Sequence, residues 1–132
     1  MKALVGLVCI LAANGCTMRH GVQLGAVDGS EELGGYFLQS TNSRLQLGSS
    51  NGRSCHGGSW WLSAFRQGGE NWSEGWILCD GGETGRWALR KPQAGDPFQS
   101  GVHVAEASIG KKMFSGEWGI GVSTAAPAEA RK

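Results

Sequence analysis

Residues 55–79 read C-H-G-G-S-W-W-L-S-A-F-R-Q-G-G-E-N-W-S-E-G-W-I-L-C, and four of the six tryptophans of the chain lie between these two cysteines. Apolar runs on both sides of a polar, glycine-containing segment are typical of paired strands. We therefore interpret the stretch as a β-hairpin region closed by a Cys55–Cys79 disulfide. A loop of this size stabilises the folded state by on the order of 3 kcal/mol in the chain-entropy description.

The N-terminus has the pattern of an export signal. A basic start is followed by an apolar run from Ala3 to Ala13 and by small residues, the order found in secretory signal peptides. Cleavage before Cys16 would leave the N-terminal cysteine of a bacterial lipoprotein, although Ala13 stands where that pattern usually has Leu. We predict that Cys16 is lipidated. The alternative is that ordinary signal peptidase cuts the same bond, after Gly15, and gives a secreted soluble protein without lipid.

These features predict how the chain is divided and where it resides. We expect a signal peptide at residues 1–15, a lipid-anchored tether at 16–30, a β domain at 31–124 and a disordered tail at 125–132. Thr17, in place of Asp after the lipidated cysteine, predicts the outer membrane, with the domain on its periplasmic face.

The cysteine count agrees with export. Of four cysteines, Cys9 would leave with the signal and Cys16 would carry lipid, which leaves Cys55 and Cys79 as a pair in an oxidising compartment. A metal site needs further ligands at fixed spacings. The three histidines, His20, His56 and His103, share no such spacing, so we expect neither a metal nor a cofactor.

Composition indicates an all-β domain. Glycine accounts for 23 of 132 residues, far above the usual share of about 7%, and it separates short apolar runs as turns do. Asn51-Gly52 is a strong hairpin signal. We predict about eight antiparallel strands in a small barrel or sandwich with one disulfide. The net charge of +1 gives no reason to expect a nucleic-acid partner.

Strand boundaries follow from alternation and turn residues. Strands are expected at residues 22–27 (an edge strand), 35–39, 44–47, 59–66, 75–79, 85–90 and 102–108, with two more beginning near residues 113 and 117.

The tryptophans have two interpretations, core filling or partner contact. Core filling is expected for Trp60, Trp76, Trp87 and Trp118. Trp61 and Trp72 have polar neighbours or lie in a polar loop, so we take them, with Arg66, as candidates for partner binding at one end of the barrel.

The sequence contains no pattern for catalysis. Ser54-Cys55-His56 places a nucleophile beside a base, but neighbours on one strand point to opposite faces, and a disulfide would consume the thiol of Cys55. The common hydrolase, metalloprotease and phosphate-loop motifs do not occur. We predict that the protein is not an enzyme.

Taken in order, several short motifs resemble the Inh family of bacterial metalloprotease inhibitors and the outer-membrane lipoproteins that carry this domain. The matching segments are Gly35-Tyr36-Phe37-Leu38, Gly52-Arg53-Ser54-Cys55, Cys79, Trp87, residues 102–107, Gly110-Lys111 and Met113-Phe114-Ser115-Gly116. They extend from about Leu33 to Val122. The resemblance implies an eight-stranded barrel, a disulfide between Cys55 and Cys79, and a protein partner such as a protease.

In the secreted inhibitors of that family, a free N-terminal trunk enters the protease cleft. With Cys16 lipidated, residues 17–24 could not enter in this way. The sequence thus predicts an envelope lipoprotein that binds a protein, with protease inhibition as the specific form. The alternative is a structural or exclusion-type lipoprotein that binds a membrane or receptor partner without inhibition.

Overall fold

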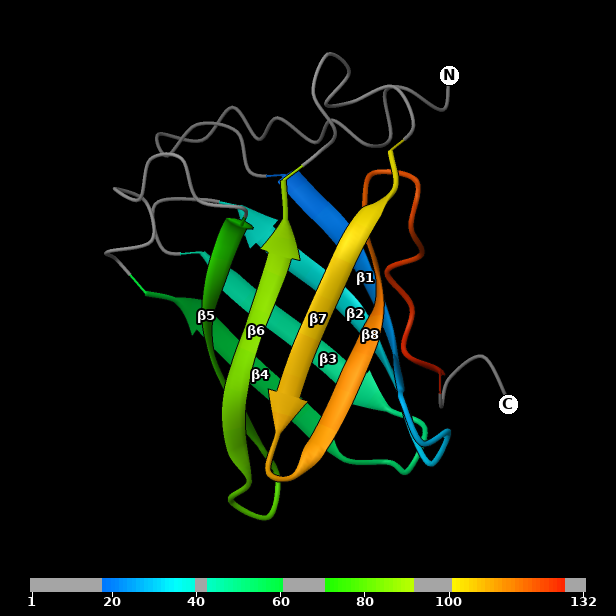
Figure 1. Ribbon diagram of the computed structural model, residues 1–132. Helices are drawn as coiled ribbons and strands as arrows, with labels where there is room; N and C mark the ends of the chain where they lie inside the picture. The colour runs from blue at the N-terminus through cyan, green and yellow to red at the C-terminus, as the bar shows by residue number, and fades with distance from the viewer. Residues whose placement is uncertain (1–17, 40–42, 61–70, 92–100, 128–132) are drawn as a thin grey trace.

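The computed structural model describes residues 18–39, 43–60, 71–91 and 101–127, and they form eight strands (Figure 1). The strands are β1 (Met18–Ala26), β2 (Glu32–Gln39), β3 (Arg44–Ser49), β4 (Ser54–Ser59), β5 (Asn71–Cys79), β6 (Thr84–Arg90), β7 (His103–Ile109) and β8 (Lys112–Gly119). The predicted all-β class is confirmed. In the described ranges, no helix is long and apolar enough to cross a membrane.

Every strand pairs antiparallel with its neighbour in sequence, and β8 pairs back onto β1 to close a barrel. The predicted edge strand is therefore wrong, because β1 has a partner on both sides. Within the expected tether at residues 16–30, Met18–Ala26 is a strand of the barrel wall. Closure satisfies backbone groups that an edge strand would expose.

The interior is packed with side chains that alternate along the strands, as the period of two requires. The largest fully buried side chains include Leu33, Phe37, Leu45, Leu47, Ile77, Leu89, Ile109 and Phe114. Two buried tryptophans also satisfy their indole N–H groups: Trp87 donates to the carbonyl oxygen of Trp76 at 2.8 Å, and Trp118 donates to that of Arg90 at 3.0 Å. The described part of the interior is thus a core in which large side chains meet.

Inward-facing glycines allow the strands to approach closely. A Cβ at Gly35 would lie 2.0 Å from the carbonyl oxygen of Gln46, and one at Gly85 would lie 1.7 Å from that of Ser108. Such contacts exclude any side chain, so these positions let adjacent strands coil tightly around a small core.

The disulfide joins two strands inside the barrel. Cys55 on β4 lies directly opposite Cys79 on β5, with their Cα atoms 3.9 Å apart, and both residues are buried. The predicted pairing is confirmed.

After β8 the chain returns along the outside of the barrel as a C-terminal strap, residues 120–127 (Figure 1). Gln23 on β1 donates from Nε2 to the carbonyl oxygens of Ser123 at 2.9 Å and Ala125 at 2.8 Å. A Cβ at Gly21 would lie 1.9 Å from the carbonyl oxygen of Val122. The first residues of the predicted disordered tail are thus placed against β1, and residues 128–132 lie outside the described ranges.

Candidate functional site

The two ends of the barrel differ in construction. The connections β1–β2, β3–β4, β5–β6 and β7–β8 are short turns that gather at one end, which we call the turn-closed end (Figure 1). Each of these turns contains at least one glycine with positive φ, for example Gly52 at 87° and Gly110 at 59°, a conformation that other residues rarely adopt. The opposite end, where β1 begins and β8 ends, we call the loop end.

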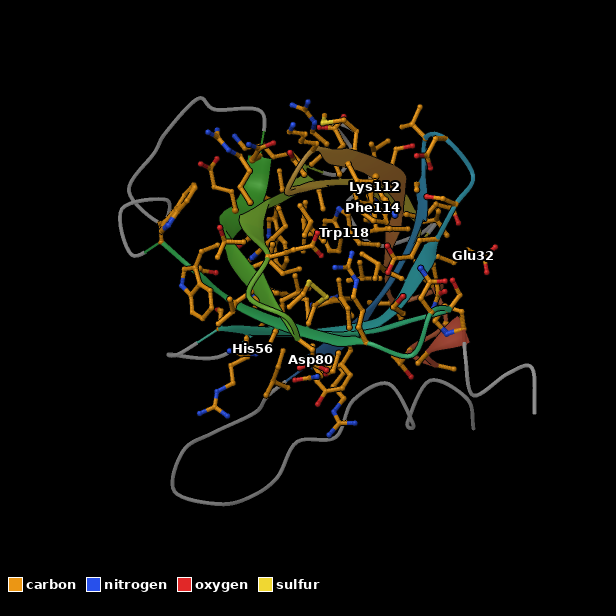
Figure 2. All side chains as sticks on the ribbon, turned by 90° about the horizontal axis from the view of Figure 1, so that it is seen from below. Glu32, His56, Asp80, Lys112, Phe114 and Trp118 are labelled. Carbon is orange, nitrogen blue, oxygen red and sulfur yellow. A yellow bond between two sulfur atoms is a disulfide. The ribbon has the colours of Figure 1, made fainter. Side chains whose placement is uncertain are left out.

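A buried carboxylate lies at the turn-closed end. Glu31 is only 2% exposed. Its two oxygens accept bonds from Arg53, Nε to Oε2 at 2.8 Å and Nη2 to Oε1 at 2.9 Å, while Lys112 Nζ approaches Oε1 at 3.2 Å. The hydroxyl of Ser49 also donates to Glu31, and Arg53 bridges onward to Glu83. Viewed from below this end, Lys112 lies inside the ring of strands (Figure 2).

This network holds Glu31 in its ionised form. Burial alone would raise the pKa of the carboxyl, but the hydrogen bonds from Arg53, Ser49 and Lys112 outweigh it and hold the pKa below its ordinary value of 4.5. Because both cations are already paired with carboxylates, Lys112 with Glu31 and Arg53 with Glu31 and Glu83, the network leaves little charge for a ligand.

Aromatic rings fill the loop end. Trp72 and Trp118 stack with ring centroids 4.5 Å apart and planes 12° apart. The imidazole of His20 meets both edge-on, at 5.3 Å and 5.5 Å between centroids, and His103 lies 4.8 Å from Trp118. Phe37 joins this cluster to Trp87 below it. These contacts fill the described part of the mouth with protein side chains.

His20 is a buried polar group of this end whose hydrogen-bonding capacity is only partly used. It is 2% exposed, its Nε2 lies 3.3 Å from Oε1 of Gln39, and its Nδ1 has no hydrogen-bond partner. Burial, reinforced by the nearby His103, lowers the pKa of His20 below 6.5 despite the opposing bond to Gln39. The ring is thus neutral at pH 7 and is part of the core, and proton uptake there would disfavour folding.

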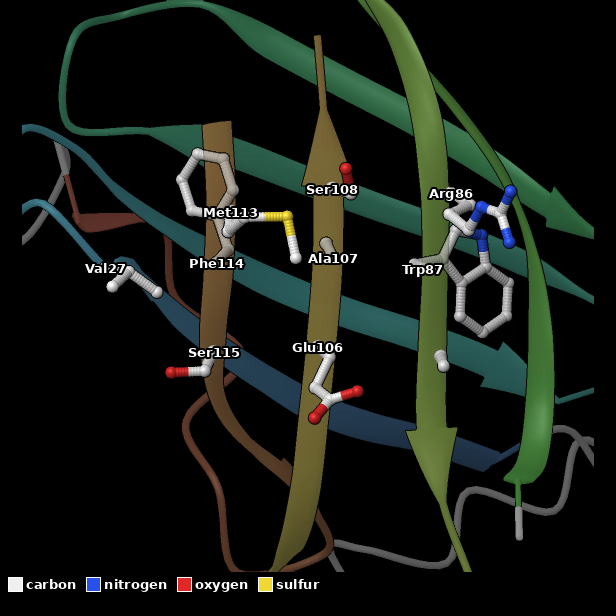
Figure 3. Close-up of a pocket in the computed structure, with 10 residues that line it drawn as sticks. Val27, Arg86, Trp87, Glu106, Ala107, Ser108, Met113, Phe114 and Ser115 are labelled. Atoms are coloured by element: carbon white, nitrogen blue, oxygen red, sulfur yellow. The ribbon is translucent and has the colours of Figure 1, made fainter. Parts of the chain in front are cut away.

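The outer surface of β6, β7 and β8 carries a hollow of about 310 Å³, and we call this surface the β6–β8 face (Figure 3). Small side chains form its floor, because Ala88, Ser108 and Ser115 lie on adjacent strands. Met113 at its edge is 58% exposed, and Val27 nearby is also exposed. Exposed apolar side chains gathered around a hollow are typical of surfaces that contact other proteins.

A second hollow, of about 410 Å³, lies on the outer surface of β2, β3, β4 and β5, and we call it the β2–β5 groove. Tyr36 and Trp76 stand on opposite sides, while Arg44, Gln46 and His56 present polar groups between them. In the view of Figure 2, His56 lies outside the ring of strands. Among the described residues that line the groove, none is acidic.

The predicted partner-binding residues are only partly placed. Trp61 and Arg66 lie outside the described residues. Trp72, expected in a polar loop, belongs to β5 and is half-buried in the aromatic cluster. One face of its ring is therefore occupied by Trp118.

Of the four tryptophans predicted to lie in the core, two are buried and two are exposed. Trp87 and Trp118 are buried as expected, but Trp60 and Trp76 are each 40% exposed, so their assignment to the core is wrong. The sequence carried the signal for Trp76. Cys79 must face its disulfide partner inside, Ile77 shares that face by alternation, and Trp76 must then point outward.

Within the described ranges, no three His, Cys, Asp or Glu side chains gather as metal ligands would. Comparison of the chain with protein-family models, curated proteins and solved structures found no match. The resemblance to the Inh family stays a prediction.

Proposed function

We propose that the protein is an exported binding protein that contacts a partner protein through its β6–β8 face. One observation carries this proposal: large side chains fill the described interior, whereas the β6–β8 face offers an apolar hollow with Met113 exposed beside it. A filled barrel acts as a scaffold and leaves binding to its outer surfaces.

The β6–β8 face combines an apolar anchor point with charges at its margin. Arg86 and Glu106 line the same hollow as Met113, and Glu106 accepts a bond of 3.0 Å from Arg90 (Figure 3). An apolar side chain of the partner would fill the hollow over Ala88 and Ser108, while the charged margin fixes its orientation. This division between an apolar centre and a polar rim is usual in protein interfaces.

Attachment through Cys16, which is part of the proposal, would orient the barrel. Only Thr17 separates Cys16 from β1, and two residues span no more than about 7 Å. A lipid at Cys16 would therefore hold the loop end against the outer membrane, in agreement with the proposed periplasmic location. The β6–β8 face lies on the side of the barrel, where a periplasmic partner could reach it.

Protease inhibition is the more specific form of the proposal and would need a mechanism other than a free trunk. Residues 18–25 pair with β2 and residues 21–26 pair with β8, so β1 cannot enter a cleft while the barrel is closed. The same observation favours the second candidate, a structural or exclusion-type lipoprotein that binds a receptor or membrane partner without inhibition.

The test is capture of an envelope partner by chemical cross-linking in the native membrane, comparing wild type with Met113→Lys. A charge at this exposed position should leave folding intact and reduce the captured complex at least about tenfold, as loss of an apolar interface contact does. Gln46→Lys is the matched control, because it places the same charge at an exposed position on β3, a strand that does not pair with β6, β7 or β8; it should retain capture. Equal capture by Met113→Lys and wild type would overturn the proposal.

A second assay separates the two forms of the proposal. Purified protein at micromolar concentration is added to metallo-, serine and cysteine proteases. Inhibition that disappears in Met113→Lys supports the inhibitor form. Unchanged rates with all three classes, together with capture that depends on Met113, support the non-inhibitory form.

A further inference from the structure

We propose that the β2–β5 groove is a separate binding site for an acidic glycan, a polysaccharide segment that carries carboxylate groups. The groove lies on the outer surface of different strands from the β6–β8 face, so this inference does not depend on the proposed protein partner. Its volume of about 410 Å³ falls within the range of about 300–1,000 Å³ that is usual for ligand sites.

Trp76 provides a flat aromatic platform. Its partner across the β4–β5 ladder is Gly58, and a Cβ on Gly58 would lie only 3.1–3.3 Å from three atoms of the indole. The indole therefore lies over the backbone of β4, in space that any other residue would fill. With 40% of the residue still exposed, the ring offers surface to solvent on the side away from Gly58. The C–H face of a sugar ring packs on such a surface and is removed from water.

Polar groups that could bind sugar hydroxyls stand beside this platform. His56 meets the Trp76 ring edge-on, with centroids 5.8 Å apart, and is itself exposed. Gln46 lies directly opposite both Tyr36 and His56 in the ladders, and its amide donates to Ser54 at 3.2 Å, which leaves its carbonyl oxygen to accept from a ligand. Tyr36 on the far side is held by Arg19, whose guanidinium lies 4.5 Å from its ring centroid.

The charge of the groove favours an anionic ligand. Arg44 lines it, is exposed and has no acidic partner among the described residues. Arg44, Gly58, Trp76 and Arg86 follow one another across adjacent strands. A guanidinium next to an aromatic platform suits a sugar carboxylate, because it can bind both oxygens at once.

Two other occupants fit the groove less well. The backbone groups under the groove are committed to the barrel ladders, so an extended peptide would find none of the main-chain bonds that strand addition requires. A membrane surface favours rings that project into the lipid, whereas Trp76 lies down on Gly58 at the side of a hollow. A ring-shaped anionic ligand uses both the platform and the arginine.

The test is a titration of the purified, oxidised protein with an oligomer of uronic acid, followed by tryptophan fluorescence and calorimetry, with a neutral glucose oligomer as the matched ligand. Wild type should bind the acidic oligomer more tightly, and added salt should weaken that preference. Trp76→Ala should reduce affinity for the acidic oligomer at least about tenfold. Arg44→Gln should remove the preference for acidic over neutral ligand while preserving residual neutral binding.

Met113→Lys is the control that keeps this test distinct from the proposed protein interface, and it should bind the uronic-acid oligomer as wild type does. The glycan proposal is overturned if wild type shows no saturable binding at millimolar oligomer, or if Trp76→Ala binds equally well. It is also overturned if the protein binds anionic lipid vesicles in a manner that depends on Trp76 but ignores the soluble oligomer.

Discussion

The two ends of the barrel are closed by opposite chemistry. At the turn-closed end a buried carboxylate, Glu31, is held by Arg53 and Lys112. At the loop end stacked rings, Trp72 and Trp118, surround a neutral imidazole. The turn-closed end relies on hydrogen bonds that converge mainly on Glu31, whereas the loop end relies on the burial of apolar ring surface.

This difference in chemistry determines which substitutions destabilise each end of the barrel. Removing the buried carboxylate on which an ionic network converges leaves its cations without that partner, so the loss of stability is concentrated in that residue. Removing one ring leaves a cavity whose cost depends on how far its neighbours can relax. The ends should therefore respond differently to mutation and to pH.

The largest effect is expected at the loop end. Trp118 is 2% exposed and contacts Trp72, His20 and His103. Trp118→Ala should lower the free energy of unfolding by about 4 kcal/mol, measured by urea denaturation. The half-exposed Trp76 is the control, and its alanine variant should lose far less. A loss for Trp118→Ala no larger than that for Trp76→Ala would show that the cluster is not a packed part of the core.

The next effect concerns the ionic network. Glu31→Gln keeps the shape of the side chain but leaves Arg53 and Lys112 without their shared carboxylate. The free energy of unfolding at pH 7 should fall by about 3 kcal/mol. Glu32→Gln, its exposed neighbour, is the matched control. Equal stability of the two variants would contradict the importance of the network.

The same variant gives a pH test. The pKa of Glu31 is lowered by folding, so its contribution is present above the ordinary value of 4.5 and is lost as pH falls through the lower folded pKa. Wild type should therefore lose stability on acidification through this range, while Glu31→Gln should lose less of it.

The smallest effect is expected from His20 and occurs at higher pH. Folding lowers its pKa below 6.5, so the unfolded chain takes up a proton more readily, and stability should fall as pH drops below about 6.5. His20→Leu should flatten this part of the profile, measured by urea midpoints between pH 5 and 8, while Glu31→Gln should leave it in place. An unchanged slope in His20→Leu would mean that another group titrates there.

Local signals predicted much of the fold. The Cys55–Cys79 pair, the Asn51-Gly52 turn and the alternation around Trp87 depend on residues near one another in sequence, and each led to a correct element. Barrel closure could not be derived in that way, because the pairing of β1 with β8 joins residues about a hundred positions apart. Local signals alone therefore predict an edge strand where β1 is paired on both sides.

The candidate sites were less predictable. The hollow around Met113 depends on small residues that come together only when three strands align. The placement of Trp76 over Gly58 requires the register of β4 against β5. The size and apolarity of tryptophan favour a core position, whereas the alternation with Ile77 and Cys79 implies the outward orientation of Trp76.

The central claim is that the barrel has a filled core and binds on its outer surfaces. The indole N–H resonances of the tryptophans, followed by NMR while the uronic-acid oligomer is added, test this most directly. We predict that the signal of Trp76 moves while those of Trp87 and Trp118, bonded to backbone carbonyls inside the barrel, stay in place. Movement of Trp118 and Trp72 with an unaffected Trp76 would show that the ligand enters the barrel mouth and would contradict the claim.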